Sequence, residues 1–347
     1  MAEFASGVPL LLLSESELLA AGLWDVAQEM FAVVEQQLCG KQEGWHGKVA
    51  LAPTNEETSA LLDLEPGTLD RYAGVRFSYK LNVLAALLPH AAGFKAIGAN
   101  VMNREGGYSR ADALYVLYDQ KSLRPRTIIR CLLLSSLRTA SYACIIQHRS
   151  RARSIGFLGS GELVRTTIRL LAQCAAPPVE EVRIYSPNLD LSSVRKSVGE
   201  VPFLLKGCDT AQSAVEDVQM VVTATTASSP VFDPSWLVSN IVHVNLGGCE
   251  APLDFVELCL RSGTVIVDDF EGTLKRGTQS LALWWRGNGS PAATESVKTF
   301  DWARNEWDSL PRPWHVTCVG RSDLDVTLAA WVDKWARLAG CGREVTL

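Results

Sequence analysis

The sequence of 347 residues lacks the patterns of a metal site and of a disulfide framework. Its nine cysteines are an odd number, and none belongs to a C-x-x-C pair, so neither disulfides nor zinc are indicated. None of the five histidines lies two or four residues from another, which also argues against a metal site. We therefore expect no metal, and a reducing cytoplasm as the location.

Long apolar runs and a strong net charge are missing as well. The apolar run near the start, Val8 to Leu13, is too short to cross a bilayer and lacks the basic flank of a signal peptide. The net charge of −5 gives no electrostatic reason to expect nucleic acid or an anionic membrane as a partner. Apolar residues make up 47% and charged residues 20%, as in soluble globular proteins, and the length allows two domains.

The first third of the chain has no helix-rich crossover between its strand-like segments. From Lys48 to Tyr118, short apolar or alternating runs are separated by Gly, Pro and Asn. These runs predict the strands of a largely antiparallel or mixed sheet. They are KVALAP, RYAGVRFSYK, GFKAIGANVM and ALYVLYD.

Helical spacing of apolar residues predicts helices in three places. Ser14 to Leu38 reads as one or two amphipathic helices, with Ser14 or Ser16 as a suitable N-cap. A second helical segment runs from Leu133 to about His148, and a final one from Asp325 to Ala339.

After residue 131 the sequence alternates between buried strands and helical segments. RSIGFLGSGELVRTTIRLLAQC combines a strand, a glycine turn and a helix, and EVRIYS, MVVTATT, IVHVNLGG and GTVIVDD predict further strands. This alternation is typical of βαβ units in a parallel sheet. We predict an α/β fold, with a Rossmann-type dinucleotide domain at residues 131–318 and a second, α+β domain formed by residues 1–130 and 319–347.

The turn Gly159-Ser160-Gly161 runs from a strand into a helix that begins near Glu162. Gly159 permits the tight turn, and Gly161 removes a Cβ that would keep the backbone from a pyrophosphate. The N–H groups of the helix start, Glu162 and Leu163 included, would then hold the phosphates. Val164 replaces the third glycine of GxGxxG, so a glycine turn without a ligand is the alternative. The strand before, the helix after and a second strand at residues 182–185 favour a nicotinamide dinucleotide.

The end of the second strand leaves NAD and NADP both open. An acidic residue there would normally bind the ribose hydroxyls, but the sequence reads Ser186-Pro187-Asn188, and Asp190 comes slightly too late. Arg195 and Lys196 could serve a 2′-phosphate, although they lie well into the next segment. Later strand ends supply further candidate cofactor contacts, namely Thr223, Ala224, Thr225, Asn245 and Gly247. For Thr223, Ala224 and Thr225 the alternative is a plain strand terminus without a ligand.

Several segments together resemble the ornithine cyclodeaminase and mu-crystallin family over almost the whole chain. In family order they are LSESELLAAG, GFKAIGANVMN, GGYSRADALYVLYD, LRTAS, FLGSGE, VTATTASSPVF, VIVDD and GRSDLDVTLA. Within the family the sequence looks most like the dehydrogenases of 2,3-diaminopropionate biosynthesis. Leu88-Pro89 and the stretch from Gly107 to Ala113, which is similar to a G-x-P-R-A-S-A pattern, carry this finer resemblance.

The resemblance implies roles for four cationic residues and one acid. Lys95 and Arg138 would bind the substrate carboxylate, Arg138 and Thr139 would also contact the cofactor, and Arg110 would lie near a second carboxylate or the cofactor. Lysine and arginine suit this task because an amino-acid substrate needs fixed cations. A surface or salt-bridged residue is the alternative for each cation, and for Lys48, a further candidate carboxylate ligand, it is equally plausible. Asp325 matches a family aspartate near the nicotinamide, and as an alternative it is an N-cap of the last helix.

Some positions depart from the family pattern. Cyclodeaminases carry an aspartate after the GG of their late strand, where this chain has Cys249, and Glu250 is displaced by one residue. This argues against ornithine cyclisation. Met102 replaces an expected proline, and Ser141 replaces the last alanine of RTAA. The departures are consistent with a new substrate, or with a loss of catalysis.

The resemblance therefore implies hydride transfer between the α-carbon of an amino acid and NAD or NADP. The leading hypothesis is a dehydrogenase like the one that oxidatively cleaves N-(2-amino-2-carboxyethyl)-glutamate to diaminopropionate and 2-oxoglutarate. An imine or ketimine reductase, a cyclodeaminase and a non-catalytic, crystallin-like dinucleotide-binding protein are the alternatives. Family relatives pair through their N-terminal sheets, so we expect a homodimer whose second domain binds substrate and forms the dimer.

Overall fold

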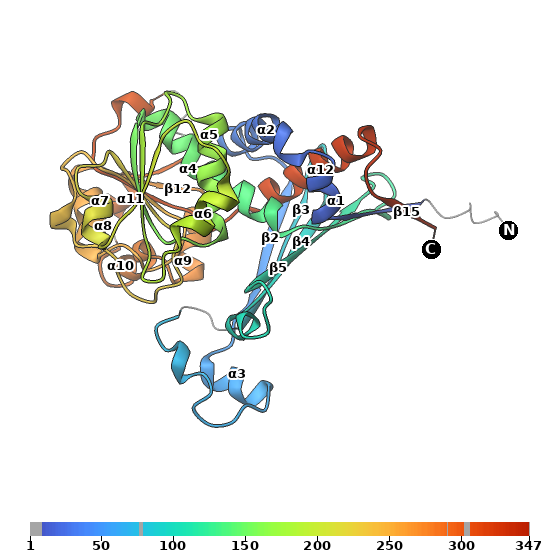
Figure 1. Cartoon of the computed structure of the whole chain (residues 1–347), viewed down its shortest axis with the longest axis horizontal. Helices are drawn as coiled ribbons and strands as arrows, with labels where there is room; N and C mark the ends of the chain where they lie inside the picture. The colour runs from blue at the N-terminus through green and yellow to red at the C-terminus, as the bar shows by residue number, and fades with distance from the viewer. Residues whose placement is uncertain (1–8, 76–78, 290, 302–305, 347) are drawn as a thin grey trace.

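The chain forms two lobes, each built on one β-sheet, in a computed structural model that describes residues 9–75, 79–289, 291–301 and 306–346 (Figure 1). One lobe carries a mixed sheet and the other a parallel sheet flanked by helices. This α/β architecture confirms the predicted fold class. Among the described residues, no helix is both long and apolar enough to cross a bilayer.

The mixed sheet has the strand order β15-β1-β6-β5-β4-β3-β2. Its pairs are antiparallel except for the parallel pair of β1 and β6. The prediction of an antiparallel or mixed sheet is therefore confirmed. The strands are β1 (Leu10–Ser14), β2 (Trp45–Leu51), β3 (Tyr79–Leu87), β4 (Ala92–Asn100), β5 (Ala111–Tyr118), β6 (Pro125–Arg130) and β15 (Arg343–Val345).

The segment between β2 and β3 differs from the prediction. RYAGVRFSYK is not one strand: η2 (Asp70–Tyr72) is a 3-10 turn, residues 76–78 lie outside the described part, and β3 begins only at Tyr79. The backbone N–H groups of Tyr72, Ala73 and Val75 bond to carbonyls three residues back, so they are not offered to a sheet. A short helix, α3 (Asn55–Leu61), also interrupts this stretch.

In the described part of the chain, helices pack on one face of the mixed sheet. The face that bears Lys48, Leu84, Lys95 and Tyr115, which are paired across β2, β3, β4 and β5, packs against α12 (Ser322–Leu338). The last helix also contacts α2 (Ala27–Cys39), which follows α1 (Glu15–Ala20) and the 3-10 turn η1 (Leu23–Val26). Ser14 caps α1 as predicted, because its side chain accepts the N–H of Glu17.

The opposite face of the mixed sheet carries exposed apolar side chains that none of the described helices covers. Register pairs Val49 with Val83 and Leu51 with Leu81, so these residues share that face. Val49 is 59% exposed, Leu51 58% and Leu81 45%. An apolar face of this kind marks a surface that favours a partner.

The parallel sheet has the strand order β13-β12-β14-β11-β10-β7-β8-β9. Every pair in it is parallel, and the run β9-β8-β7-β10-β11 is the Rossmann order. The strands are β7 (Ser154–Leu158), β8 (Glu181–Tyr185), β9 (Leu204–Gly207), β10 (Met220–Thr223), β11 (Val242–Asn245), β12 (Thr264–Val267), β13 (Val297–Thr299) and β14 (Trp314–Thr317).

Helices flank both faces of this sheet and bury two apolar clusters. The helix predicted from Leu133 is α4 (Leu132–Ser150), which lies between the lobes and packs on α5. The others are α5 (Glu162–Cys174), α6 (Leu191–Val198), α7 (Ala211–Val215), α8 (Leu253–Ser262), α9 (Phe270–Arg276), α10 (Ser280–Asn288) and α11 (Pro291–Glu295), with the 3-10 turns η4 (Pro234–Trp236) and η6 (Trp307–Ser309). The 3-10 turn η3 (Val101–Arg104) lies between β4 and β5 of the mixed sheet.

Candidate functional site

A buried ion-pair cluster lies where the mixed sheet, α4 and α12 meet. The Asp325 carboxylate accepts hydrogen bonds from Lys95 Nζ at 2.8 Å and from Arg138 Nε at 3.0 Å. The side chains of these three residues are 0%, 2% and 7% exposed. Ser135 Oγ is a further acceptor for Lys95 at 3.2 Å. Three residues that the sequence singled out separately are therefore in direct contact.

The structure corrects the alternative role of Asp325 as an N-cap. Arg321, in an extended conformation, occupies the N-cap position of α12, and Asp325 is the fourth residue of the helix. Its side chain points toward the sheet and is paired with Lys95 and Arg138, so it caps no backbone N–H. A sequence pattern of a polar residue near a helix start does not distinguish these two positions.

Burial and neighbouring charges shift the proton affinities of the cluster. Complete burial lowers the pKa of Lys95 to about 7, although Asp325 opposes this effect. Burial would raise the pKa of Asp325, but Arg138 and Lys95 outweigh it and hold that pKa below its ordinary value. The cluster therefore contains an ammonium group that can exchange its proton near neutral pH.

Lys48 lies on the same sheet face as Lys95, with Leu84 of β3 between them in the register. Its Nζ donates to the carbonyl of Val319 at 2.9 Å. Burial, followed by Arg276 and Arg138, lowers the pKa of Lys48 to about 8. Lys48 is therefore half-buried beside the loop that precedes α12, and its role as a carboxylate ligand stays a prediction.

The loop from β14 to α12 is held by a carboxylate to which the sequence reading gave no role. Asp268 accepts the N–H groups of Val319 at 2.9 Å and Gly320 at 2.8 Å, and the hydroxyl of Tyr142 at 2.7 Å. Gly320 has a φ of +85°, and a Cβ there would lie 2.9 Å from Arg138 Nη1. Asp268 belongs to the VIVDD motif, but its partners Val319 and Gly320 lie 51 and 52 residues further along the chain.

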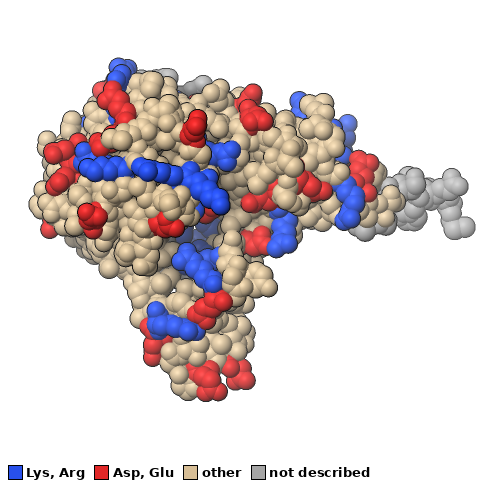
Figure 2. All heavy atoms as spheres, in the orientation of Figure 1, with Lys and Arg blue, Asp and Glu red and all other residues tan. Residues whose placement is uncertain are grey.

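A cavity of about 680 Å³ adjoins Lys48 at the junction of the lobes. Basic side chains outnumber acidic ones in its lining: Lys48, Lys80, Lys275, Arg276 and Arg321 against Asp269 and Glu271. Figure 2 shows a hollow where the lobes meet, with Lys and Arg side chains at its margin. A cavity with this lining suits an anionic small molecule.

The glycine turn has the geometry that a dinucleotide requires. Gly159 has a φ of +117°, and a Cβ there would lie 2.6 Å from the carbonyl oxygen of Ala224, at the end of β10. Gly161 is the N-cap of α5, and no atom lies within 4 Å of the place where its Cβ would be. Open space in front of a helix N-terminus fits a pyrophosphate, with the N–H groups of Glu162 and Leu163 as donors.

The end of β8, which would face the adenosine ribose, carries no carboxylate. Ser186 is half-buried and Asn188 is exposed. Asp190 instead caps α6, because its carboxylate accepts the hydroxyl of Ser192 at 2.6 Å and the N–H of Ser193 at 3.0 Å. Arg195 is turned toward β9, where it donates to the carbonyl of Leu205 at 3.0 Å.

The ends of β10 and β11 direct two candidate residues inward. Thr223 and Asn245 are fully buried, and Asn245 Nδ2 donates to the carbonyl of Gly248 at 2.7 Å. Thr223 Oγ1 lies 3.1 Å from Nε2 of the buried His243. Their side chains bond to neighbouring groups at the strand ends, and their contact with the cofactor stays a prediction.

Glu250 and Cys249 are neighbours in the sequence but differ in how far their side chains are buried. Glu250 is fully buried, and its carboxylate accepts the N–H and the hydroxyl of Thr225. It joins the loop after β11 to the loop after β10, beside Gly247. Cys249, at the position where cyclodeaminases carry an aspartate, is partly exposed. The described residues include no group of His, Cys, Asp and Glu that could hold a metal ion.

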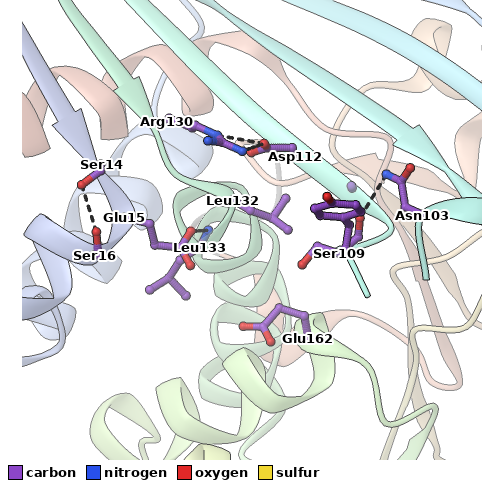
Figure 3. A pocket seen from close by; sticks show the side chains of 12 residues that line it. Ser14, Glu15, Ser16, Asn103, Ser109, Asp112, Arg130, Leu132, Leu133 and Glu162 are labelled. Carbon is purple, nitrogen blue, oxygen red and sulfur yellow. Dashed lines mark hydrogen bonds and ion pairs between the residues drawn. The ribbon is translucent and has the colours of Figure 1, made fainter. Parts of the chain in front are cut away.

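A second pocket, of about 590 Å³, separates the start of α5 from the end of the mixed sheet (Figure 3). Glu162 lines it from the α5 side, and Asn103, Tyr108 and Ser109 line it from the sheet side. Arg130 and Asp112, which form an ion pair of 2.7 Å, also line the pocket. Arg110 lies in the sequence between Ser109 and Ala111, which both line this pocket. No hydrogen bond or ion pair between described residues links Arg110 to Lys95, Arg138 or Asp325.

Comparisons with known proteins find relatives in sequence and in fold. The ornithine cyclodeaminase from Agrobacterium fabrum is 26% identical over 168 residues, which are 46% of either protein, so the chain matches about half the length of its curated relatives. The Thermococcus litoralis Delta(1)-pyrroline-2-carboxylate reductase, solved with NADH and L-proline, has a TM-score of 0.74 at 17% identity, covering 97% of this chain and 100% of that one. An archaeal alanine dehydrogenase dimer with bound NAD has a TM-score of 0.72 at 17% identity, covering 97% and 99%.

The family model described as "Ornithine cyclodeaminase/mu-crystallin family" matches residues 71–295, more than half of the chain. The motifs that predicted this family are spread over the same region and beyond it. The chain belongs to the ornithine cyclodeaminase/mu-crystallin family.

Proposed function

We propose that this protein is an NAD(P)-dependent oxidoreductase that acts on the C–N bond of a carboxylate-bearing amino acid. The finer proposal is oxidative cleavage of N-(2-amino-2-carboxyethyl)-L-glutamate to 2,3-diaminopropionate and 2-oxoglutarate. The observation that carries the proposal is the contact of Lys95, Arg138 and Asp325 in a buried cluster between the two lobes. Membership of the family supports an enzyme of this class.

The charge of the cluster supports a carboxylate substrate. Lys48 is surrounded by Arg138 and Arg276 as well as by Asp268 and Asp325. Together with Lys95 these residues give four cationic side chains and two carboxylates in a partly buried cluster. A substrate carboxylate would reduce this excess of positive charge, and arginine can bind it through two parallel hydrogen bonds.

The chain's own residues would position the amino acid and exchange protons. Lys95 has a pKa of about 7, so it can accept a proton from the substrate amine or return one near neutral pH. Arg138 and Lys48 would hold the carboxylate, which fixes the α-carbon relative to the cofactor. Asp325 orients Lys95 and Arg138 for these tasks.

The glycine turn would hold the dinucleotide. Gly161 leaves open space before the first N–H groups of α5, and Gly159 lets the turn approach Ala224. When bound, the nicotinamide supplies hydride transfer, and the protein contributes orientation and exclusion of water. Oxidation of the α-carbon gives an imine, and its hydrolysis by water releases the oxo acid and the amine.

The uncovered apolar face of the mixed sheet supports a homodimer. Val49, Leu51 and Leu81 lie on this face, and each is more than two-fifths exposed. Two copies that pack these faces together would remove the apolar surface from water. The archaeal alanine dehydrogenase of the same fold was solved as a dimer.

A direct assay tests the substrate. Purified protein is incubated with NAD or NADP and N-(2-amino-2-carboxyethyl)-L-glutamate, and the absorbance of the reduced nicotinamide is followed. We expect reduction of the cofactor together with formation of 2-oxoglutarate and diaminopropionate. L-Glutamate, which lacks the aminocarboxyethyl group, is the matched control. Bound dinucleotide without turnover of this substrate would reject the finer proposal and retain only cofactor binding.

Reduction of an imine is the second candidate, since the same cations serve a cyclic or open-chain imino acid. The Thermococcus litoralis protein, whose name states such a reduction, shares the fold. A panel of imino acids with NADH and NADPH separates this candidate from the first. The placement of Cys249, and the engagement of Glu250 with Thr225, argue against cyclodeamination because neither offers the cyclodeaminase aspartate.

A further inference from the structure

The dinucleotide subsite contains a cation whose role the proposed function leaves unexplained. Arg165 is the fourth residue of α5 and extends from the glycine turn toward the start of α6. Its Nε donates to the carbonyl of Ser160 at 3.2 Å, and its Nη1 donates to Ser193 Oγ at 3.1 Å. The guanidinium therefore connects the turn that would hold the pyrophosphate with the helix that follows β8.

Arg165 is half-buried and has no carboxylate partner. None of the ion pairs formed by the described residues includes it. Asp190 is near enough for their charges to interact, but its carboxylate already accepts bonds from Ser192 and Ser193. A partly desolvated guanidinium that bonds only to neutral oxygens is suited to an additional anion.

The place between the glycine turn and the end of the second strand is where a Rossmann domain holds the adenosine ribose. An acid at the strand end binds the 2′-hydroxyl in NAD-dependent proteins, and it repels a 2′-phosphate. Here Ser186 and Asn188 take that place, and both can donate hydrogen bonds to phosphate oxygens. The only acid in this short segment, Asp190, is used as the cap of α6.

We infer that Arg165, together with Ser186 and Asn188, forms a 2′-phosphate subsite that makes the protein select NADP(H) over NAD(H). This inference rests on the proposed cofactor role of the glycine turn and settles a choice that the sequence left open. Of the candidates that the sequence suggested, Arg195 is turned toward the carbonyl of Leu205, and Lys196 is exposed on α6. An arginine near the second strand is a known way to accommodate this phosphate.

Calorimetric titration of the full chain with NADP+ and with NAD+ tests the subsite without any need for turnover. We expect NADP+ to bind at least about tenfold more tightly, as one charge-assisted pair of hydrogen bonds provides. Arg165→Met should remove about tenfold of NADP+ affinity and change NAD+ affinity less than about threefold. Arg195→Met is the matched control and should leave both affinities unchanged.

A second variant is needed because Arg165→Met also removes the hydrogen bond to the Ser160 carbonyl and could change the conformation of the glycine turn. Asn188→Asp places an acid at the end of β8 without touching Arg165, and it should favour NAD+ over NADP+. Equal affinities in the unmodified protein, tighter NAD+ binding, or equal losses for both dinucleotides in Arg165→Met would each overturn the inference while cofactor binding stands. Binding of neither dinucleotide would reject the proposed function as well.

Discussion

Lys95 and Asp325 form an ion pair of 2.8 Å although 230 residues separate them and their side chains are 2% and 0% exposed. Lys95 comes from β4 of the mixed sheet, and Asp325 comes from the first turn of α12. Because Arg138 of α4 shares the same carboxylate, the pair joins a sheet and two helices at the junction of the lobes.

Replacement of Lys95 by alanine should abolish turnover and leave dinucleotide affinity nearly intact. The reason is that Lys95 lies in the carboxylate cluster, whereas the glycine turn belongs to β7 and α5. Steady-state kinetics and calorimetric titration with the cofactor measure the two effects. Lys334→Ala, an exposed lysine of α12, is the control and should keep full activity. An unchanged rate in Lys95→Ala would reject the proposed role of Lys95 in exchanging the substrate proton.

The stability difference between the unmodified protein and Lys95→Met should depend on pH. The pKa of Lys95 is about 7 in the folded chain and near 10.5 in the unfolded one, so between these values the unfolded state binds more protons. Stability from this group therefore rises with pH across that window and is independent of pH below it. From pH 7 to 9 the gain is about 2 kcal/mol.

Urea unfolding at a series of pH values measures this difference, and the methionine variant cancels the contribution of every other group. A difference that stays flat from pH 7 to 9 would mean that Asp325 holds the proton on Lys95. Lys95 would then be excluded as a group that exchanges protons near neutrality.

Two glycines of the same turn should respond differently to a side chain. At Gly161 a Cβ meets no atom within 4 Å, so Gly161→Val should fold normally and bind the dinucleotide at least about tenfold more weakly. At Gly159 the φ of +117° and the Ala224 carbonyl at 2.6 Å leave no room, so Gly159→Val should lower the melting temperature. Calorimetry gives both readouts. Equal dinucleotide affinity in Gly161→Val would place the pyrophosphate elsewhere.

A charge on the uncovered sheet face should prevent the homodimer. Val49→Asp places a carboxylate among Val83, Leu51 and Leu81, where a partner sheet would bury it. We expect the mass measured by light scattering to fall from that of two chains to that of one. Leu338→Asp, at the end of α12 and 81% exposed, is the control and should remain dimeric. A monomeric unmodified protein would contradict the proposal.

Much of the parallel lobe follows from the sequence alone. The strand, glycine turn and helix from Ser154 to Cys174 form as predicted, because hydrophobic periodicity and glycine conformation act over a few residues. The segments of β9, β13 and β14 were not identified, since LLKG, VKT and WHVT lack the continuous apolar runs that marked β10 and β12. The family motifs also singled out Lys95 and Arg138 in advance.

Only the tertiary structure decided how those residues meet. Asp325 fitted a helix cap equally well until α12 packed on the sheet and turned it toward Lys95. Lys48 and Lys95 share a face because of the antiparallel registers of β2, β3 and β4, which long-range pairing sets. Arg165 carried no signal in the sequence, because its role depends on its contact with Ser193, which lies 28 residues further along the chain. The sequence motifs thus identified the candidate side chains, and tertiary packing decided which of them lie in contact and form a site.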